Sequence, residues 1–166
     1  MAVAVDTWEE RCQKKYIVPE LIEEKAASLK SEGKSIATLN GSFDLLHAGH
    51  LHMIYEASKQ ADVLIVALNT DESIQQYKSE DRPIIPLPYR AQMMAAIGFV
   101  GYVTWFAETD PRALLRKISP DVHVNGAEYG EQCLEAEVVK QGGGRIHIVE
   151  LVPGLSTSEI IKKIKG

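Results

Sequence analysis

The sequence has few cysteines, few positive charges and no long apolar runs, and each shortage excludes a class of protein. Its two cysteines, Cys12 and Cys133, are far apart, which predicts neither a disulfide framework nor a paired-cysteine zinc site. The formal net charge of -5 argues against general nucleic-acid binding. No stretch reaches the roughly 18 apolar residues of a membrane span, and the first residues do not resemble a signal peptide. We therefore expect a cytoplasmic protein with no nucleic-acid or membrane partner.

The composition is that of an ordinary globular domain. The chain has 166 residues, of which 45% are hydrophobic and 25% charged, and this length suffices for one core. Residues 1–33 predict an N-terminal arm and a helix that pack on the domain. Residues 34–166 then form the domain itself.

Strand patterns alternate with helix patterns along the chain. Short apolar runs predict strands at 35–39, 62–68, 102–106, 122–124 and 145–149. Helical spacing predicts helices at 19–33, 47–59, 88–99, 111–118, 131–141 and 156–164, the fourth with Thr109 or Asp110 as N-cap. Residues 70–88 contain three prolines and cannot form one regular element. The α/β order predicts a Rossmann-like, doubly wound, mainly parallel five-stranded sheet with helices on both faces.

Three histidines lie close together at residues 47, 50 and 52. The first two stand where a strand gives way to a helix, which is where open α/β sheets bind ligands. The free N–H groups of a helix start favour phosphate. His47 and His50 are three residues apart and face one spot, and Gly49 leaves room for a ligand. We interpret the pair as a phosphate cradle, with a zinc site and a capping or core role as open alternatives. His52 faces elsewhere and is interpreted as structural.

Residues 40–50, N-G-S-F-D-L-L-H-A-G-H, resemble the G-x-F-D-x-x-H-x-G-H signature of the cytidylyltransferase-like nucleotidyltransferases. The resemblance extends over residues 34–164. The segments R-P-I-I-P-L-P-Y-R (82–90) and L-V-P-G-L-S-T-S-E-I-I-K-K-I (151–164) are similar to those of heptose 1-phosphate adenylyltransferases, the adenylyltransferase domain of bifunctional heptose kinase/adenylyltransferases. The segment N-G-A-E-Y-G (125–130) departs from the usual V-K-G-G-D-Y pattern, because Asn125 replaces the lysine.

This resemblance implies transfer of AMP from ATP to a sugar 1-phosphate, D-glycero-D-manno-heptose 1-phosphate. Pyrophosphate leaves, and the product is ADP-heptose for the lipopolysaccharide core. Mg²⁺ is expected to enter with ATP, and no residue is expected to hold a metal of its own. Relatives are commonly dimeric or larger, which leaves room for a homo-oligomer. Two alternatives stay open: a cytidylyltransferase for glycerol 3-phosphate or a similar small phosphate, and a nucleotide-binding module without turnover.

The expected site residues fall into three groups. The catalytic group is His47, His50 and Lys78. The nucleotide-binding group is Asn40, Gly41, Ser42, Phe43, Gly49, Asn69, Asn125, Ser156, Thr157 and Ser158. The substrate-binding group is Asp44, Arg82, Arg90 and Glu128.

Several of these residues also have a local interpretation. Ser156 and Glu159 have the spacing of a capping box, which explains both without a ligand. Lys78 and Arg82 lie in a proline-rich loop, where they either close over a triphosphate or are solvated surface charges. Arg90 stands at a helix start, an unfavourable place for a cation, which indicates an anionic partner. Asp44 orients a histidine or accepts from backbone N–H groups of its tight loop.

Overall fold

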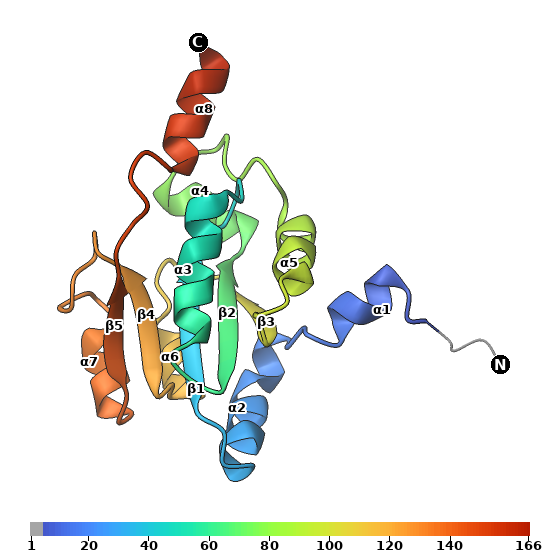
Figure 1. The fold of residues 1–166 in the computed structure, drawn as a ribbon, viewed down its shortest axis with the longest axis vertical. Helices are drawn as coiled ribbons and strands as arrows, with labels where there is room; N and C mark the ends of the chain where they lie inside the picture. Colours follow the sequence, from blue (N-terminus) through green and yellow to red (C-terminus); the bar gives the residue numbers. More distant parts are fainter. Residues whose placement is uncertain (1–4) are drawn as a thin grey trace.

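The computed structural model describes residues 5–166, and its centre is one sheet of five parallel strands (Figure 1). The strand order is β3-β2-β1-β4-β5, and every neighbouring pair is parallel. The chain crosses to the other side of β1 after β3, so the order reverses between β1 and β4. This confirms the predicted fold and places the expected ligand crevice at the carboxyl ends of β1 and β4. The strands are β1 (Ile36–Gly41), β2 (Val63–Asn69), β3 (Tyr102–Phe106), β4 (Val122–Gly126) and β5 (Arg145–Val149).

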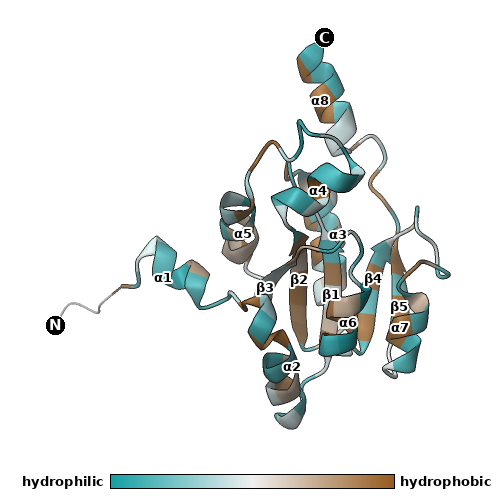
Figure 2. Ribbon diagram, turned by 180° about the vertical axis from the view of Figure 1, so that it is seen from behind, coloured by the Kyte–Doolittle hydropathy of each residue, from teal (hydrophilic) through white to brown (hydrophobic). Residues whose placement is uncertain are grey.

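Helices cover both faces of the sheet. On one face α3 (Ala48–Ser58) and α5 (Leu87–Ala96) pack on alternate residues such as Leu39 and Val66. On the other, α2 (Ile22–Ser31) and α6 (Arg112–Ile118) pack on Ile36 and Ile65. The inner strands are therefore buried from both sides, which explains the continuous apolar run of β2 and its brown colour in Figure 2.

The remaining helices lie at the margins of the sheet. The helix α7 (Ala136–Gln141) packs beside α6 and β5, whereas α4 (Asp71–Tyr77) and α8 (Thr157–Lys165) stand beyond the carboxyl ends of the strands (Figure 1). No helix of the described residues is long and apolar enough to cross a bilayer.

The N-terminal segment extends the sheet at β3. It contains α1 (Trp8–Gln13) and the 3₁₀ helix η1 (Pro19–Leu21). Between them the Ile17 N–H donates to the Val103 carbonyl (2.9 Å), and the Val103 N–H donates to the Lys15 carbonyl (2.8 Å). These bonds cover the edge of β3, which would otherwise carry free backbone groups.

Most element boundaries differ from the sequence prediction by one to three residues, and the predicted helix at 19–33 divides into η1 and α2. Three differences bear on the site. Residues 70–88 contain the helix α4, whose start is capped by Thr70, and only the part after Tyr77 is irregular. The helix α6 begins one residue later than predicted, with Pro111 as N-cap and no side-chain cap, while Asp110 accepts from the Arg112 N–H. The helix α7 begins at Ala136 rather than 131, because Cys133 and Leu134 form part of an irregular loop at the cleft described next.

Candidate active site

A cleft of about 690 Å³ lies at the carboxyl ends of β1, β2 and β4. The starts of α3 and α8 also face it, so two sets of free helix N–H groups point toward one space. The sequence-predicted residues that line it are Asn40, Gly41, Ser42, Phe43, His47, Gly49, His50, Asn69, Lys78, Asn125, Glu128, Ser156 and Thr157. The topology thus brings segments as far apart in the chain as Asn40 and Thr157 to one edge of the sheet.

The loop after β1 is tightly built. Phe43 is buried and has a φ of 44°, in the left-handed region that a bulky residue rarely adopts. A Cβ atom on Gly41 would lie 3.0 Å from the Phe43 ring, so glycine lets the ring fold back over the strand end. Such strained segments persist where the surroundings determine them, and they cluster at ligand sites.

His47 and His50 form a reciprocal pair at the start of α3. The His50 N–H donates to His47 Nδ1 (3.4 Å), and the His47 N–H donates to His50 Nδ1 (3.3 Å). The two rings stack with centroids 3.7 Å apart and planes 21° apart. Because both Nδ1 atoms accept, each neutral ring carries its hydrogen on Nε2. The predicted shared direction of the two rings is confirmed, and the capping alternative is also correct for the same residues.

The two imidazoles are held neutral at pH 7. Burial, with repulsion from His47 and Lys78, lowers the pKa of His50 to about 4, and burial also lowers the pKa of His47. The His47 Nε2 atom is buried and has no hydrogen-bond partner. The pair therefore contacts a ligand as neutral rings that donate from Nε2. His52 is exposed and does not line the cleft.

Lys78 brings a positive charge to the other side of the loop. Its Nζ donates to Ser42 Oγ (3.0 Å), next to the loop that leads to the histidines. Burial is the main cause that lowers the pKa of Lys78, with the charges of Arg82 and Arg90 in support. A cation that is partly desolvated in this way interacts more strongly with a phosphate than a solvated one does.

Asp44 and Arg90 were predicted to bind the substrate, but neither lines the cleft. The side chain of Asp44 is fully buried and accepts from Arg82 Nε (2.6 Å) and from the N–H groups of Ile84 and Ile85. It therefore holds the proline-rich loop onto the loop after β1. A supporting role was predicted, but the backbone N–H groups belong to the proline-rich loop and not to the loop of Asp44 itself. Arg90 is 1% exposed and donates to the carbonyls of Ser42 and Asn69 and to Asp71. Its anionic partner is Asp71, so it positions cleft-lining segments and does not reach the cleft.

Arg82 and Ser158 are also placed differently from the prediction. Neither lines the cleft, and both line a separate cavity on the far flank of α8. Glu128 does line the cleft, where its carboxylate folds over Gly126; a Cβ atom at Gly126 would collide with it.

Two amides without partners mark the ends of β1 and β4. These strands pair in register at Leu39 and Val124, so Asn40 and Asn125 follow on adjacent strands. Asn125 is 7% exposed, and its Nδ2 has no hydrogen-bond partner; neither has Asn40 Oδ1. Buried polar atoms are normally paired, so this donor and this acceptor are available to a ligand in the cleft.

The start of α8 closes the cleft from above. Ser156 Oγ accepts from the Glu159 N–H (3.1 Å), but the reciprocal bond of a capping box is absent, so that part of the prediction is wrong. Thr157 Oγ1 donates to the Leu45 carbonyl (3.4 Å), which ties α8 to the loop before α3. The hydroxyls of Ser156 and Thr157 are thereby held beside the histidine pair.

Several cleft residues were not predicted from the sequence. Most follow β3, β4 or β5 or lie in the loop before α7, whereas Met53 lies in α3 and Tyr77 in α4. Most are apolar or aromatic: Leu39, Met53, Tyr77, Thr109, Asp110, Pro111, Gly126, Tyr129, Cys133, Leu134, Glu135, Leu151, Val152 and Leu155. For the residues that follow strands, the available signal was that position, because the strands of a parallel sheet all end at the same edge.

Comparison with known proteins places this geometry in a family. The model described as cytidylyltransferase-like matches residues 38–163. A bifunctional protein HldE of Gluconacetobacter diazotrophicus is 42% identical over 144 residues, which cover 86% of this chain and 30% of that protein. The HldE of Pseudomonas aeruginosa PAO1 is 41% identical over 137 residues, covering 82% of this chain and 29% of that protein. The chain thus spans about 30% of the length of these curated relatives.

Two solved structures share the fold. The lipopolysaccharide core biosynthesis protein of Thermoplasma volcanium GSS1 has a TM-score of 0.58 and 25% identity, covering 72% of this chain and 98% of that one. The pantoate-beta-alanine ligase of Francisella tularensis, complexed with beta-gamma ATP and beta-alanine, has a TM-score of 0.56 and 16% identity. The match covers 90% of this chain and 77% of that one. The second likeness shows the fold alone.

Proposed function

The chain belongs to the cytidylyltransferase-like family of nucleotidyltransferases, and from this premise we propose that it transfers AMP from ATP to D-glycero-D-manno-heptose 1-phosphate. The products would be ADP-heptose and pyrophosphate. The observation that carries the chemistry is the stacked pair of His47 and His50 at a helix start, in which the buried Nε2 of His47 has no partner within the protein. The heptose acceptor is supported by the similarity to HldE and by the segments 82–90 and 151–164.

The proposed reaction needs no nucleophile from the protein. An oxygen of the acceptor phosphate is already ionised at pH 7 and attacks the α-phosphorus of ATP. A new P–O bond forms while the bond from the α-phosphorus to the bridging oxygen of pyrophosphate breaks, and that oxygen leaves with the electron pair. Catalysis then depends on positioning and on neutralising the charge that develops on the α- and β-phosphates.

Different residues of the cleft would position the phosphates and neutralise their charge. His47 and His50 would donate from Nε2 to the phosphate oxygens, and Lys78 would supply a full positive charge from the opposite side. Ser156 and Thr157, with the free N–H groups of α8, would hold the outer phosphates. Mg²⁺ would enter bound to the phosphates of ATP, as part of the substrate. The reaction is proposed for the cytoplasm, and a homo-oligomer stays a prediction.

Pyrophosphate release from a panel of nucleotides and acceptors tests this proposal. We expect the highest kcat/KM with Mg²⁺-ATP and the heptose 1-phosphate. Faster release with CTP and glycerol 3-phosphate would replace the proposal with the cytidylyltransferase alternative. Binding of ATP with no release from any acceptor in the panel would support the nucleotide-binding module instead.

Histidine variants test whether the same cleft performs the reaction. His47→Asn keeps a good N-cap residue, and His50→Ala removes the second ring; each is expected to lower kcat at least a hundredfold, roughly 3 kcal/mol of transition-state stabilisation. His52→Ala, in an exposed position on the same helix, is the control and should retain nearly full turnover. Near-normal kcat in either of the first two variants would remove that histidine from the mechanism.

A further inference from the structure

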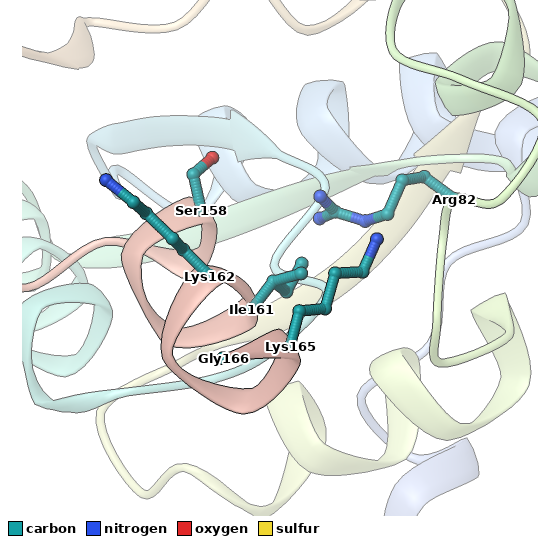
Figure 3. Close-up of a pocket in the computed structure, with 6 residues that line it drawn as sticks. All are labelled: Arg82, Ser158, Ile161, Lys162, Lys165 and Gly166. Carbon is teal, nitrogen blue, oxygen red and sulfur yellow. The ribbon is translucent and has the colours of Figure 1, made fainter.

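A second cavity, of about 450 Å³, lies between α8 and the loop that carries Arg82 (Figure 3). Its lining is Arg82, Ser158, Ile161, Lys162, Lys165 and Gly166, and none of these residues lines the active-site cleft. The lining side chains comprise three cations, one hydroxyl and one aliphatic group, and no side-chain carboxylate. The two spaces lie on different sides of α8, whose residues Ser156 and Thr157 face the cleft.

Two of the cations approach each other across this cavity. Arg82 and Lys165 both line it, and in Figure 3 their side chains extend toward the same space beside Ile161, whereas Lys162 extends away along the flank of α8. No ion pair joins Lys162 or Lys165 to an acid among residues 5–166. Arg82 is paired with Asp44, whereas Lys162 and Lys165 have no paired acid, so the lining carries an excess of positive charge that attracts an anion.

The guanidinium of Arg82 is only partly used by the protein. Its side chain is 14% exposed, and Nε donates to Asp44, but Nη2 is buried and has no partner. Asp44 also accepts from two backbone N–H groups, so its charge is shared among three donors. A buried guanidinium nitrogen without an acceptor costs free energy, and a ligand oxygen would supply the missing bond.

The donors indicate which kind of anion fits. The planar fork of an arginine matches the oxygens of a phosphate, a lysine adds a point charge, and the Ser158 hydroxyl adds a neutral donor. The cavity is open to solvent, so a second phosphate or a small organic group attached to the anion could extend out of it.

We propose that this cavity is a second anion site, which binds the phosphate group of pyrophosphate or of a small phosphorylated molecule. The assignment is independent of the reaction proposed for the cleft, because it depends on a different set of side chains. Occupation would pair Arg82 and Lys165 through the ligand and hold the flank of α8 against the loop of residues 78–86.

Amide chemical shifts of the ¹⁵N-labelled full chain can locate the bound anion. Pyrophosphate, inorganic phosphate and glycerol 3-phosphate are titrated separately, without metal, at low and at physiological ionic strength. We expect the amides of Arg82, Ser158 and Ile161 to shift with one dissociation constant, and those of His47 and His50 with another. Stronger binding of glycerol 3-phosphate than of pyrophosphate would identify the organic source, and the reverse order the diphosphate.

Charge variants of α8 separate a site from a general surface attraction. Lys162→Gln/Lys165→Gln is expected to weaken binding at the cavity amides by about fivefold or more, whereas Lys163→Gln, in the same helix but outside the lining, leaves it unchanged. Arg82 itself is not varied, because its loss would unpair the buried Asp44. The proposal is overturned if the cavity amides do not shift, or if Lys163→Gln weakens binding as much as the double variant. Shifts at the cavity with no turnover in the cleft would leave it standing.

Discussion

His47 and His50 use one ring nitrogen, Nδ1, to cap α3, and the other, Nε2, is the one that can contact a ligand. The Nδ1 atoms accept from the first N–H groups of the helix, which fixes the ring orientation and the tautomer. The Nε2 of His47 then has no partner within the protein and is available to a phosphate, and burial keeps both rings neutral. The capping role and the ligand-binding role are therefore compatible, because the capping bonds to Nδ1 fix the direction in which the Nε2–H groups point.

His123 is a histidine of another kind, and it predicts acid sensitivity. It is fully buried, its Nδ1 bonds Thr38 Oγ1 (2.8 Å), and its Nε2 has no partner. Burial lowers its pKa to about 4. The unfolded chain takes up a proton near pH 6.5 but the folded chain only near pH 4, so stability is intact above about pH 6.5 and is lost as the pH falls toward 4.

His123→Gln, which keeps a partner for Thr38, is therefore expected to reduce this loss, by up to roughly 3 kcal/mol. Denaturant unfolding at pH 7 and pH 4.5 measures it, with the exposed His52→Gln as control. His50 titrates in the same window, so part of the loss should remain. An unchanged difference between the two pH values in His123→Gln would show that this residue does not control the acid response.

At the scale of elements, the first turn of α5 carries Arg90, which holds the segments that line the cleft in place. Arg90 lies there against the helix macrodipole, which is unfavourable for a cation. It is retained because four donor–acceptor pairs surround it, to Ile85, Ser42, Asn69 and Asp71. One side chain thus connects the loops that follow β1 and β2.

We expect Arg90→Met to destabilise the fold by about 3–5 kcal/mol, because Asp71 and three carbonyls lose their donor. Activity at temperatures where the variant is folded should also fall, since the loop of Ser42 loses its support. Urea unfolding and kcat/KM measure the two effects. The matched control is Tyr89→Ala, the preceding residue, which is 60% exposed. A cost below about 1 kcal/mol for Arg90→Met would contradict the assigned role.

At the scale of the whole molecule, residues before the first core strand complete the sheet. Ile17 is 6% exposed within the core on the α2 side, and Tyr16 packs edge-on against Trp105 with ring centroids 6.2 Å apart. We propose on this basis that the N-terminal arm and the domain form one folding unit.

Removal of residues 1–20 should therefore expose the edge of β3 and lower the melting temperature by about 10 °C or more. Removal of residues 1–5 is the control and should change it by no more than about 1 °C. Circular dichroism during heating measures both. Equal melting temperatures for the intact chain and the longer deletion would mean that the arm adds nothing to the fold.

Local patterns in the sequence determined the order of strands and helices. The strands at 102–106 and 145–149 were predicted to the residue, and each begins directly after a glycine. The order of elements then implies a parallel sheet, and a parallel sheet implies that all strand ends share one edge. The histidine pair could be placed at that edge because its spacing and its position at a helix start are local properties.

Only the tertiary structure decided what the charged residues do. Arg90 and Asp44 looked like ligand contacts, yet their partners lie on other elements: Ser42 and Asn69 for the first, and Arg82 for the second. The energy of a buried charge depends on which groups surround it from every side, and packing sets that environment after the chain has folded. Arg82 is a further example. Its segment predicted that it would bind the substrate in the cleft, but packing against Asp44 places it at the second cavity.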